Sequence, residues 1–410
     1  MRKSLEFLLS LKGNPKYCLF TEPLWGIPFI LYMPFITVYM YHLGVLDFEI
    51  GLILALSRLA QVPIALIGGV VTDKFGRRLT TLVGDCISWS IPTLIWAFSQ
   101  NFWWFLAAFM VNALMQITTV SWECLWVDDL DEKTVGPIYN WVYIAGLLAV
   151  FFAPISGYFV GIYGVVPVVR VLYLVAFVFM TAKFVILYIY STETERGIER
   201  MAATKHLSIK SLLAGYPAVV KQILRSGKMV QALILQSMLG SMLFITGTFF
   251  ALYTTQDLNI PEAFLAYFQI LRAGVMLSFL LFIQSFLSKY NSRKILFAGL
   301  FLFIFTFILL LAAPVDNWVW IAVYTIINAC ASAMILPRVD TVAANAIEPK
   351  ERARIRSIFN MIIIGISSPF VFFAGILSDI NRQLPFVLIL FLLVIMVVVV
   401  FAGKERSEAA

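Results

Sequence analysis

A run of ten residues, Gly69 to Arg78, places one carboxylate and three cations between two long apolar stretches. Acidic and basic groups at such close spacing form charge pairs, and partly exposed pairs contribute only about 0–1 kcal/mol each. They can therefore break and re-form during a conformational cycle. Gly76 predicts a tight turn, because glycine tolerates positive φ, and Gly69 predicts close approach of a neighbouring helix. The residues that carry this chemistry are Gly69, Asp73, Lys74, Gly76, Arg77 and Arg78.

Two carboxylates lie inside long apolar stretches, where an ionisable side chain costs at least about 2.5–3.5 kcal/mol on insertion scales. Glu22 and Glu123 are therefore the candidates for binding a substrate or for loading and unloading a proton. Glu22 shares a helix face with Phe29 and Met33. Aromatic and thioether side chains suit an apolar or amphipathic organic substrate, including a cation. Ordinary helix packing explains these two side chains equally well.

A polar stripe runs along a predicted helix over residues 102–127. Asn112, Gln116, Thr119 and Glu123 follow one another at spacings of 4, 3 and 4. Such spacing places all four on one face of a helix. The stripe predicts either the wall of a water-filled path or hydrogen bonds to partner helices, and both interpretations stay open.

Other polar residues at membrane depth are isolated. Arg58 and Arg272 are expected to pair with Glu123 or to contact a substrate anion. Asp85 is expected to brace the cations of the 69–78 loop, and Lys183 to extend its long stem to a membrane interface. Further polar groups on apolar faces include Ser241 and Asn328.

The composition requires a membrane environment for most of the chain. Hydrophobic residues make up 61% of it and charged residues 13%, with a mean hydropathy of +0.92, whereas soluble domains are about 45–50% apolar and about 25% charged. Apolar runs of about 20 residues, which cross about 30 Å of hydrocarbon, recur along the chain. Twelve are expected, at residues 19–42, 48–71, 80–98, 102–127, 136–161, 166–191, 229–253, 261–287, 293–313, 317–337, 354–378 and 384–402. An all-α integral membrane protein follows, because backbone polar groups in lipid must be satisfied within each segment.

The basic residues are distributed asymmetrically about these segments. With both ends on one side, the connections on that side hold 25 of the 30 Lys and Arg, and those on the other side hold only Arg382. The positive-inside rule then places both termini in the cytoplasm of a multi-pass cell-membrane protein. Anionic lipid accounts for the net charge of +7, so no nucleic-acid partner is expected. No removable signal peptide is expected, and the four cysteines lack metal-ligand spacing, so no metal is expected.

The chain repeats itself at about half its length. Asn101 with Asn317, Trp104 with Trp320, and Arg77 with Arg293 coincide at an offset of 216, and Pro154 with Pro369 at 215. The repeat predicts a six-helix bundle over 1–191, a linker over 192–228 and a second six-helix bundle over 229–410. The linker is expected to carry an amphipathic helix, Ser208 to Ser226, on the inner leaflet.

The loop pattern G-x-x-x-D-[RK]-x-G-[RK]-[RK] is matched at every specified position by residues 69–78. The chain therefore resembles the major facilitator superfamily of transporters. The resemblance implies twelve transmembrane helices in two pseudo-symmetric six-helix bundles that rock about a midplane site. It also implies that the loop is a cytoplasmic latch, in which Asp73 is the carboxylate and Arg77 pairs with an acid at the end of the fourth helix. Asp128 and Asp129 are the candidates for that acid.

The resemblance also bears on the cavity and on helix shape. The superfamily arranges its first, fourth, seventh and tenth helices around the cavity. The candidate lining residues, with the arginines of the second and eighth helices added, are Phe29, Met33, Asn112, Gln116, Thr119, Ser241, Asn328, Arg58 and Arg272. Antiporters of the superfamily carry a glycine-rich motif in the fifth helix, of which this chain keeps Pro154 and Gly157. Helix kinks are expected at these two residues and at Pro369.

The function expected is that of a secondary active transporter that moves a small organic solute by alternating access. Proton-coupled efflux of an amphipathic compound is favoured, and uptake of a sugar or metabolite by a symporter or uniporter is the alternative. A membrane sensor or enzyme is a remote alternative, because the chain has no GxSxG, HExxH or phosphate-binding loop. No catalytic residue and no cofactor are expected. The partners expected are the solute, the lipid bilayer and protons, with the protein a monomer.

Overall fold

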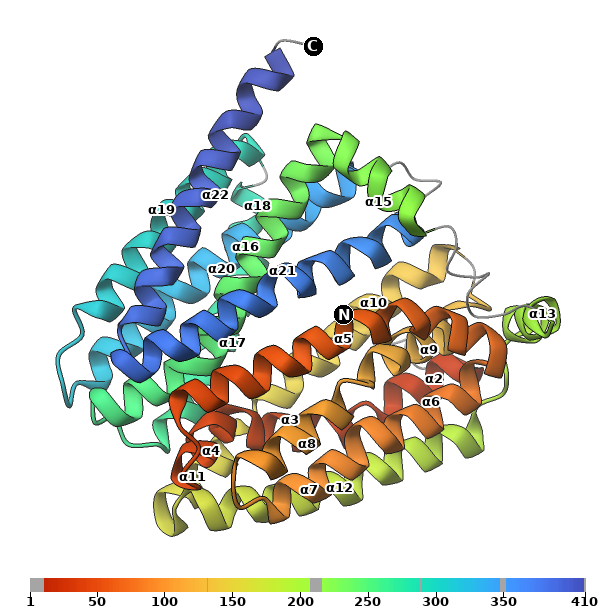
Figure 1. Cartoon of the computed structure of the whole chain (residues 1–410), viewed down its shortest axis with the longest axis horizontal. Coiled ribbons are helices and arrows are strands. Elements are labelled where there is room, and N and C mark those ends of the chain that lie inside the picture. Colours follow the sequence, from red (N-terminus) through yellow and green to blue (C-terminus); the bar gives the residue numbers. More distant parts are fainter. Residues whose placement is uncertain (1–10, 131, 207–215, 288, 347–351, 409–410) are drawn as a thin grey trace. The chain divides into compact units, whose positions relative to one another are not determined.

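The computed structural model describes residues 11–130, 132–206, 216–287, 289–346 and 352–408, and within them the chain is helical with no β-strand (Figure 1). Contacts among these residues form two compact units. The first draws its described residues from Met1–Met33, Ala60–Ser156 and Val166–Ala214, and the second from Pro34–Leu59, Gly157–Val165 and Gly215–Ala410. Two segments of the N-terminal half, 34–59 and 157–165, thus pack with the helices of the C-terminal half. The symmetric halves that the repeat predicts stay a proposal.

The first unit contains the helices up to residue 204, apart from those two segments. They are α2 Gly13–Thr21, α3 Pro23–Tyr32, the second part of α5 Asp47–Phe75, α6 Arg77–Asp85, a π-helical turn Cys86–Ser90, α7 Ile91–Phe98, α8 Phe102–Asn112, α9 Met115–Val127, α10 Glu132–Val150, the start of α11 Ala153–Tyr163, nearly all of α12 Val165–Tyr190, and α13 Glu195–Thr204. A buried cluster of Cys18, Leu19, Leu125, Trp126, Ile138 and Leu187 joins four of these helices. The polar groups described below lie around this core.

The second unit contains the remaining helices. They are a 3₁₀ turn Met33–Phe35 that enters it, α4 Ile36–His42, the first part of α5, the end of α11, α15 Tyr216–Arg225, α16 Gly227–Leu252, a π-helical turn Tyr253–Asp257, α17 Phe264–Ser278, a π-helical turn Phe279–Ile283, α18 Gln284–Leu287, α19 Ser292–Leu311, α20 Trp318–Ala346, α21 Arg352–Ile380 and α22 Leu384–Glu408. Contacts within this unit are densest between α19 and α20 and between α16 and both α21 and α22.

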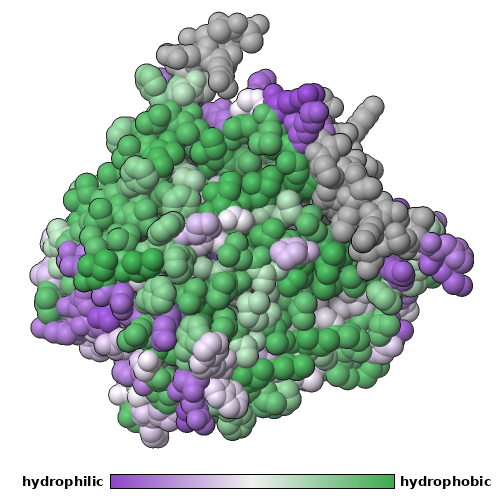
Figure 2. All heavy atoms as spheres, in the orientation of Figure 1, coloured by the Kyte–Doolittle hydropathy of each residue, from purple (hydrophilic) through white to green (hydrophobic). Residues whose placement is uncertain are grey.

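Eleven helical stretches among the described residues are long and apolar enough to cross a membrane. They are Gly13–His42, Asp47–Phe75, Arg77–Phe98, Phe102–Val127, Ile144–Tyr163, Val165–Tyr190, Gly227–Asp257, Arg293–Leu311, Trp318–Ala343, Ile358–Ile380 and Leu384–Ala402. The segment predicted at 261–287 consists of α17, a π-helical turn and α18, of which Phe264–Ser278 is a shorter apolar helix. Apolar residues dominate the face seen in Figure 2. The chain therefore has the spans of a multi-pass membrane protein, and the count of twelve stays a prediction.

Proline interrupts two of the predicted spans. The first breaks at Glu22, between α2 and α3, because Pro23 lacks a backbone N–H and so removes one helix hydrogen bond. The fifth breaks at residues 151–152, just before Ala153 and Pro154 open α11. The kink expected at Pro154 thus stays a prediction, next to a two-residue turn between α10 and α11.

The other two residues at which kinks are expected lie within helices. Gly157 lies within the regular turns of α11, and a Cβ there would lie 2.8 Å from the backbone oxygen of Ala263. This glycine allows close backbone approach to the start of the α17 region, and a kink at Gly157 stays a prediction. Pro369 lies inside α21, which continues through it, and a kink there stays a prediction.

The described part of the expected amphipathic helix is α15, and residues 208–215 lie outside the described residues. Val219 and Ile223 on α15 are 4% and 0% exposed, and they pack with Ala232, Ala343 and Phe359 in a buried cluster. The apolar face of α15 is therefore covered by α16, α20 and α21. That α15 lies on the inner leaflet stays a prediction.

Candidate functional site

The turn between α5 and α6 is made by Gly76, as expected from the sequence. Its φ of +82° lies in the region that favours glycine. The expected role of Gly69 is wrong for the part of the chain that the structure describes, because a Cβ there would meet none of its atoms within 4 Å. The close approach occurs one residue earlier, where a Cβ on Gly68 would lie 3.2 Å from the backbone oxygen of Gln116.

The latch residues come together within the first unit. Arg77 Nε donates to Asp128 Oδ2 at 2.8 Å, and its Nη2 lies 3.2 Å from Asp73 Oδ1. The side chains of Arg77 and Asp128 are only 4% and 8% exposed, against 21% for Asp73. Of the two candidate acids, Asp128 is therefore the partner of Arg77.

Asp129 has another role, at the start of α13. Its carboxylate accepts a hydrogen bond from the backbone N–H of Glu195 at 3.1 Å. Burial raises the pKa of Asp129, and the backbone hydrogen bonds from Glu195 and Arg196 partly oppose this shift. Asp129 thus places the N-terminus of α13 against the end of α9.

Two further residues contact the latch residues, and no motif or spacing in the sequence predicts them. We call Asp73, Arg77, Asp128, Glu193 and Arg200 the latch cluster. Glu193 accepts hydrogen bonds from the backbone N–H groups of Arg77 and Arg78 at 2.9 and 3.0 Å, which satisfies the N-terminus of α6. Arg200 on α13 donates to Asp73 Oδ2 through Nε at 3.1 Å and Nη2 at 2.7 Å. Hydrogen bonding to Asp73 raises the pKa of Arg200. The start of the linker is therefore part of the latch cluster.

The remaining cations of the loop differ from each other. Arg78 donates to the backbone oxygen of Tyr188 at 2.9 and 2.7 Å, and its guanidinium lies 4.1 Å from the centre of that ring. Lys74 forms no ion pair within the described ranges. Arg78 therefore anchors α6 to α12, while Lys74 has no comparable contact there.

Replacing Gly76 with alanine is expected to destabilise the protein by at least about 1–2 kcal/mol, the cost of a Cβ in left-handed backbone. The added Cβ would also lie 2.5 Å from Glu193 Oε2 and would disturb the carboxylate that caps α6. Thermal unfolding in detergent, followed by circular dichroism, measures the loss. Gly69→Ala is the matched control, because no described residue would lie within 4 Å of the added Cβ, and an equal loss in both variants would contradict the assignment.

A buried ion pair lies among aromatic rings inside the membrane-spanning part of the first unit. Lys183 Nζ on α12 donates to Glu22 Oε2 at 2.7 Å, with side-chain exposures of 5% and 13%. Lys183 Nζ also lies 5.7 and 5.3 Å from the ring centres of Trp25 and Trp122. The interpretation that Lys183 extends to an interface is wrong, because its ammonium is held at membrane depth by a carboxylate and two indole faces.

Asp85 belongs to the same group of charges. It is 6% exposed, and the charges that act on it are those of Lys183 and Glu22. The expectation that Asp85 braces the loop cations is wrong, since Asp73, Asp128 and Tyr188 hold them. We call Glu22, Asp85 and Lys183 the buried charge cluster.

Two members of the predicted polar stripe are engaged in hydrogen bonds between helices. Asn112 Nδ2 donates to the backbone oxygen of Ser88 at 2.7 Å, and Gln116 Nε2 donates to Gln61 Oε1 at 3.0 Å. Ser88 lies in a π-helical turn, where the backbone pattern is irregular and where functional sites are frequent. The hydrogen-bonding interpretation therefore describes these two amides.

The other two members of the stripe are exposed. Thr119 donates to the backbone oxygen of Met115, and Glu123 accepts a hydrogen bond from the hydroxyl of Tyr139. Helix α8 ends at Asn112 and α9 begins at Met115. The stripe is thus interrupted, and its exposed part is the face that carries Glu123.

The remaining cavity candidates lie in both units. In the first unit, Phe29 stacks on Trp25 with ring centres 4.8 Å apart, and Met33 is 38% exposed. In the second unit, Ser241 is fully buried and donates to the backbone oxygen of Ser237, within its own helix, at 2.8 Å. Asn328 is 6% exposed and donates to Thr306 Oγ1 at 3.4 Å.

The two membrane arginines have no carboxylate partner among the described residues. Arg58 Nη2 donates to Ser367 Oγ at 2.8 Å, and Arg272 Nη2 lies 3.5 Å from Ser332 Oγ. The expected pairing of either arginine with Glu123 is therefore not found there.

A second ion cluster lies in the second unit and was not predicted. Arg382, the basic residue between α21 and α22, donates to Asp47 Oδ2 at 2.8 Å and to Asp257 Oδ1 at 2.9 Å. Ser378 also donates to Asp47 at 2.7 Å, and the Asp47 side chain is 3% exposed. Burial lowers the pKa of Arg382, but hydrogen bonds to Asp47 and Asp257 outweigh that effect and raise it. We call Asp47, Asp257, Ser378 and Arg382 the Arg382 cluster.

The Arg382 cluster coincides with tight helix contact. A Cβ on Gly51 would lie 2.6 Å from the Cα of Gly375, so the backbones of α5 and α21 touch. His42, at the end of α4, contacts the carboxylate of Glu262, which comes just before α17 in the chain. These contacts fasten residues 34–59 to the C-terminal helices of the second unit.

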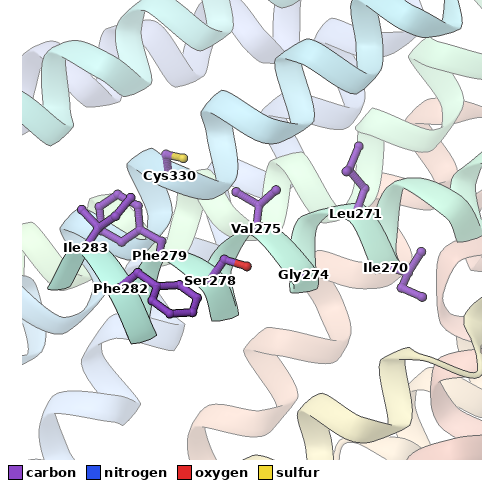
Figure 3. A pocket seen from close by; sticks show the side chains of 9 residues that line it. All are labelled: Ile270, Leu271, Gly274, Val275, Ser278, Phe279, Phe282, Ile283 and Cys330. Atoms are coloured by element: carbon purple, nitrogen blue, oxygen red, sulfur yellow. The ribbon is translucent and has the colours of Figure 1, made fainter.

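The second unit also has an open apolar groove along α17 (Figure 3). Its volume is about 580 Å³, and it is lined by Ile270, Leu271, Gly274, Val275, Ser278, Phe279, Phe282, Ile283 and Cys330. Within the searched residues, no group of His, Cys, Asp and Glu is placed to hold a metal ion.

Similar proteins agree on the class of protein. The chain is 31% identical over 134 residues to the uncharacterized MFS-type transporter YqjV of Bacillus subtilis (strain 168), and it spans 32% of that relative's length. It is also 33% identical over 72 residues to the quinolone resistance protein NorA of Staphylococcus aureus, a match that covers 18% of each chain.

Two solved structures share the fold over nearly the whole chain. The nucleoside transporter NupG has a TM-score of 0.71 at 18% identity and covers 96% of this chain and 99% of its own. A POT family transporter in complex with a thioalcohol-conjugated peptide has a TM-score of 0.73 at 13% identity and covers 98% and 99%. The sequence model of the Major Facilitator Superfamily matches residues 25–370. The chain belongs to the Major Facilitator Superfamily.

Proposed function

We propose that this protein is a secondary active transporter that exports a small amphipathic organic solute in exchange for protons by alternating access. The observation that carries the coupling is the buried charge cluster. Lys183 Nζ lies 2.7 Å from Glu22 at membrane depth, and the nearly buried Asp85 interacts with both. Ionisable groups inside membrane spans mark substrate or proton paths in many transporters.

The charge count supports proton exchange at this cluster. Two carboxylates and one ammonium leave one uncompensated negative charge if all three are ionised, and an unpaired buried charge is unfavourable. The cluster is therefore expected to share a proton while it is dry and to release it when water reaches one side. Glu123, exposed and bonded to Tyr139, is the second candidate carboxylate.

The side chains near Glu22 favour an amphipathic solute over a sugar. Trp25, Phe29 and Trp89 form an aromatic group with ring centres 4.8–6.0 Å apart. The amides that a sugar site would need are engaged elsewhere: Asn112 with Ser88, Gln116 with Gln61, Gln236 with Asp340 and Asn328 with Thr306. The name of the partial relative NorA, a quinolone resistance protein, points to the same class of solute. Uptake of a sugar or metabolite is the competing proposal.

Alternating access requires contacts that hold each end shut in turn. We assign the Arg382 cluster to the external end and the latch cluster to the cytoplasmic end, with both termini in the cytoplasm of a monomer in the cell membrane. Twelve spans in two six-helix halves, 1–191 and 229–410, belong to the same proposal. The pairs in both clusters join separate helices, so breaking them would free these ends to move.

Reconstitution into liposomes tests the proposal. With a pH-sensitive dye trapped inside, a lipophilic cation and a fluoroquinolone are added in turn under an imposed proton gradient. At least one is expected to move protons, and Glu22→Gln is expected to reduce that flux at least tenfold, with Glu123→Gln also reducing it. Glu199→Gln, an exposed carboxylate on α13, is the control and is expected to change nothing. Unchanged coupled flux in both Glu22→Gln and Glu123→Gln would sink the coupling proposal.

A further inference from the structure

Arg58 lies at the middle depth of a membrane-spanning helix. It is on α5, which runs from Asp47 to Phe75, and at 1.5 Å per residue it lies about 16 Å along the helix from Asp47. The hydrocarbon core of a bilayer is about 30 Å thick. The guanidinium is therefore far from either interface, and lipid headgroups lie at the interfaces.

The contacts of Arg58 within the second unit are all neutral. Its Nη2 donates to Ser367 Oγ on α21 at 2.8 Å, and its guanidinium carbon lies 4.2 Å from the centre of the Phe244 ring on α16. Its Nε is buried and has no hydrogen-bond partner among the described residues. A ring face contributes about 0.5–2 kcal/mol, which does not replace a counter-charge at this depth.

Four other cations in or near the membrane-spanning segments have a compensating partner, which Arg58 lacks within the described ranges. Lys183, Arg77 and Arg382 each have a carboxylate within 3.2 Å. Arg170 donates to the backbone oxygen of Ser99, which caps the C-terminus of α7 and carries partial negative charge. Arg58 has neither kind of compensation among the described residues. One buried N–H group without a partner and one positive charge without a counter-charge thus lie beside an aromatic ring in the described part of the chain.

We propose that Arg58 binds an oxyanion group of the transported solute, so that the solute is an amphipathic carboxylate or a zwitterion bearing one. This inference rests on the proposed function and narrows its substrate class. A planar guanidinium forms parallel hydrogen bonds to a carboxylate. Phe244, already against the guanidinium, offers an apolar surface to the adjoining part of the solute. The position at mid-depth assigns the anion to a solute rather than to a lipid headgroup.

Binding of matched acid and ester probes tests the proposal. Purified protein in detergent is dialysed to equilibrium against a fluoroquinolone or 4-phenylbutanoate, and against the methyl ester of each. The wild type is expected to bind at least one acid at least tenfold more tightly than its ester. In Arg58→Gln the ratio of acid affinity to ester affinity is expected to fall to about one. Arg58→Lys is expected to keep part of this ratio, because the positive charge remains while the planar guanidinium is lost.

Controls separate this effect from loss of structure. Arg170→Gln removes a membrane arginine that has a backbone partner, and it is expected to keep the wild-type ratio. Ser367→Ala keeps the charge and removes only a hydroxyl, so it serves as a folded second variant with a smaller drop in the ratio. Gel filtration and circular dichroism establish the fold of each variant.

Three results would overturn the proposal. They are equal binding of acid and ester to the wild type for both probe pairs, an acid preference that survives in Arg58→Gln, and displacement of the bound acid by phosphatidylglycerol but not by benzoate. The last would assign Arg58 to a lipid headgroup. Acid-selective binding without any flux in liposomes would contradict the proposed transport function and leave the binding site intact.

Discussion

Replacing Lys183 with methionine is expected to destabilise the protein by about 3–5 kcal/mol, because removing one partner of a buried pair leaves the other charge uncompensated. Glu22 and Asp85, whose charges act on each other, would then have no cation between them to compensate, in a site where the Glu22 side chain is 13% exposed and Asp85 is 6% exposed. Two indole faces would also lose their cation. Reversible unfolding in mixed detergent micelles, followed by circular dichroism, measures the loss.

The double variant Glu22→Gln with Lys183→Met separates the ion pair from packing. Removing both charges is often neutral for stability, so most of the loss is expected to return. Proton-coupled flux is expected to stay low, because two of the three groups of the buried charge cluster are gone. A double variant as unstable as Lys183→Met alone would show that the side-chain volume of Lys183, rather than its charge, supports the fold.

Replacing Arg382 with leucine is expected to cost about 3 kcal/mol, at the lower end of the range for a broken buried pair, since water reaches part of this cluster. The Arg382 side chain is 21% exposed, while Asp47 is 3% exposed and would keep only Ser378 as a partner among the cluster residues. The same unfolding measurement applies. Arg382→Lys keeps the positive charge but lacks the planar guanidinium with its several N–H donors, and it is expected to lose less stability than Arg382→Leu.

The functional consequence of Arg382→Leu distinguishes a gate from a structural support. If the Arg382 cluster holds one end shut, the variant is expected to shift the conformational population toward opening at that end. Reaction of a cysteine placed at Leu46, which is 57% exposed and adjoins Asp47, with a membrane-impermeant maleimide would then become faster. Asp47→Asn with Arg382→Gln is the paired control for stability. An unchanged labelling rate in an unstable Arg382→Leu variant would leave the cluster a structural role only.

The loop and the class of fold could be predicted from local patterns of sequence. Gly76 has the positive φ that its place in the pattern requires, and Arg77 pairs with an acid that follows the fourth span, as the family resemblance implied. These contacts join neighbours along adjacent helices, where helix geometry limits the choices. The apolar runs likewise fix where spans occur, because their lengths follow from the thickness of the bilayer.

Contacts between distant segments could not be predicted in the same way. Glu22 and Lys183 are 161 residues apart, and Asp47 and Arg382 are 335 apart. Each is a single charge in a long apolar or connecting segment, and no periodicity selects its partner. The roles expected of Lys183 and Asp85 were wrong for this reason.

Gly69 and Gly157 show a second limit. A glycine pattern identifies positions where backbone freedom or space is used, but the neighbouring helix decides which use applies. Gly69 has no neighbour within 4 Å of its Cβ position among the described residues, whereas Gly157 and Gly51 allow close backbone approach. The rotation of a helix about its axis, which sets these contacts, depends on packing across the whole unit.

Alternating access, the central claim, is tested most directly by paired spin-label distances. In a cysteine-free background, one pair of spin labels is placed at Leu46 and Val315 and reports on the end that carries the Arg382 cluster. A second pair is placed at Phe75 and Tyr290 and reports on the end that carries the 69–78 loop. All four residues are more than half exposed. Double electron–electron resonance is recorded in lipid nanodiscs with the wild-type sequence and with Arg382→Leu. We expect the first distance to lengthen and the second to shorten in Arg382→Leu. Distances that both stay fixed, or that lengthen together, would contradict alternating access.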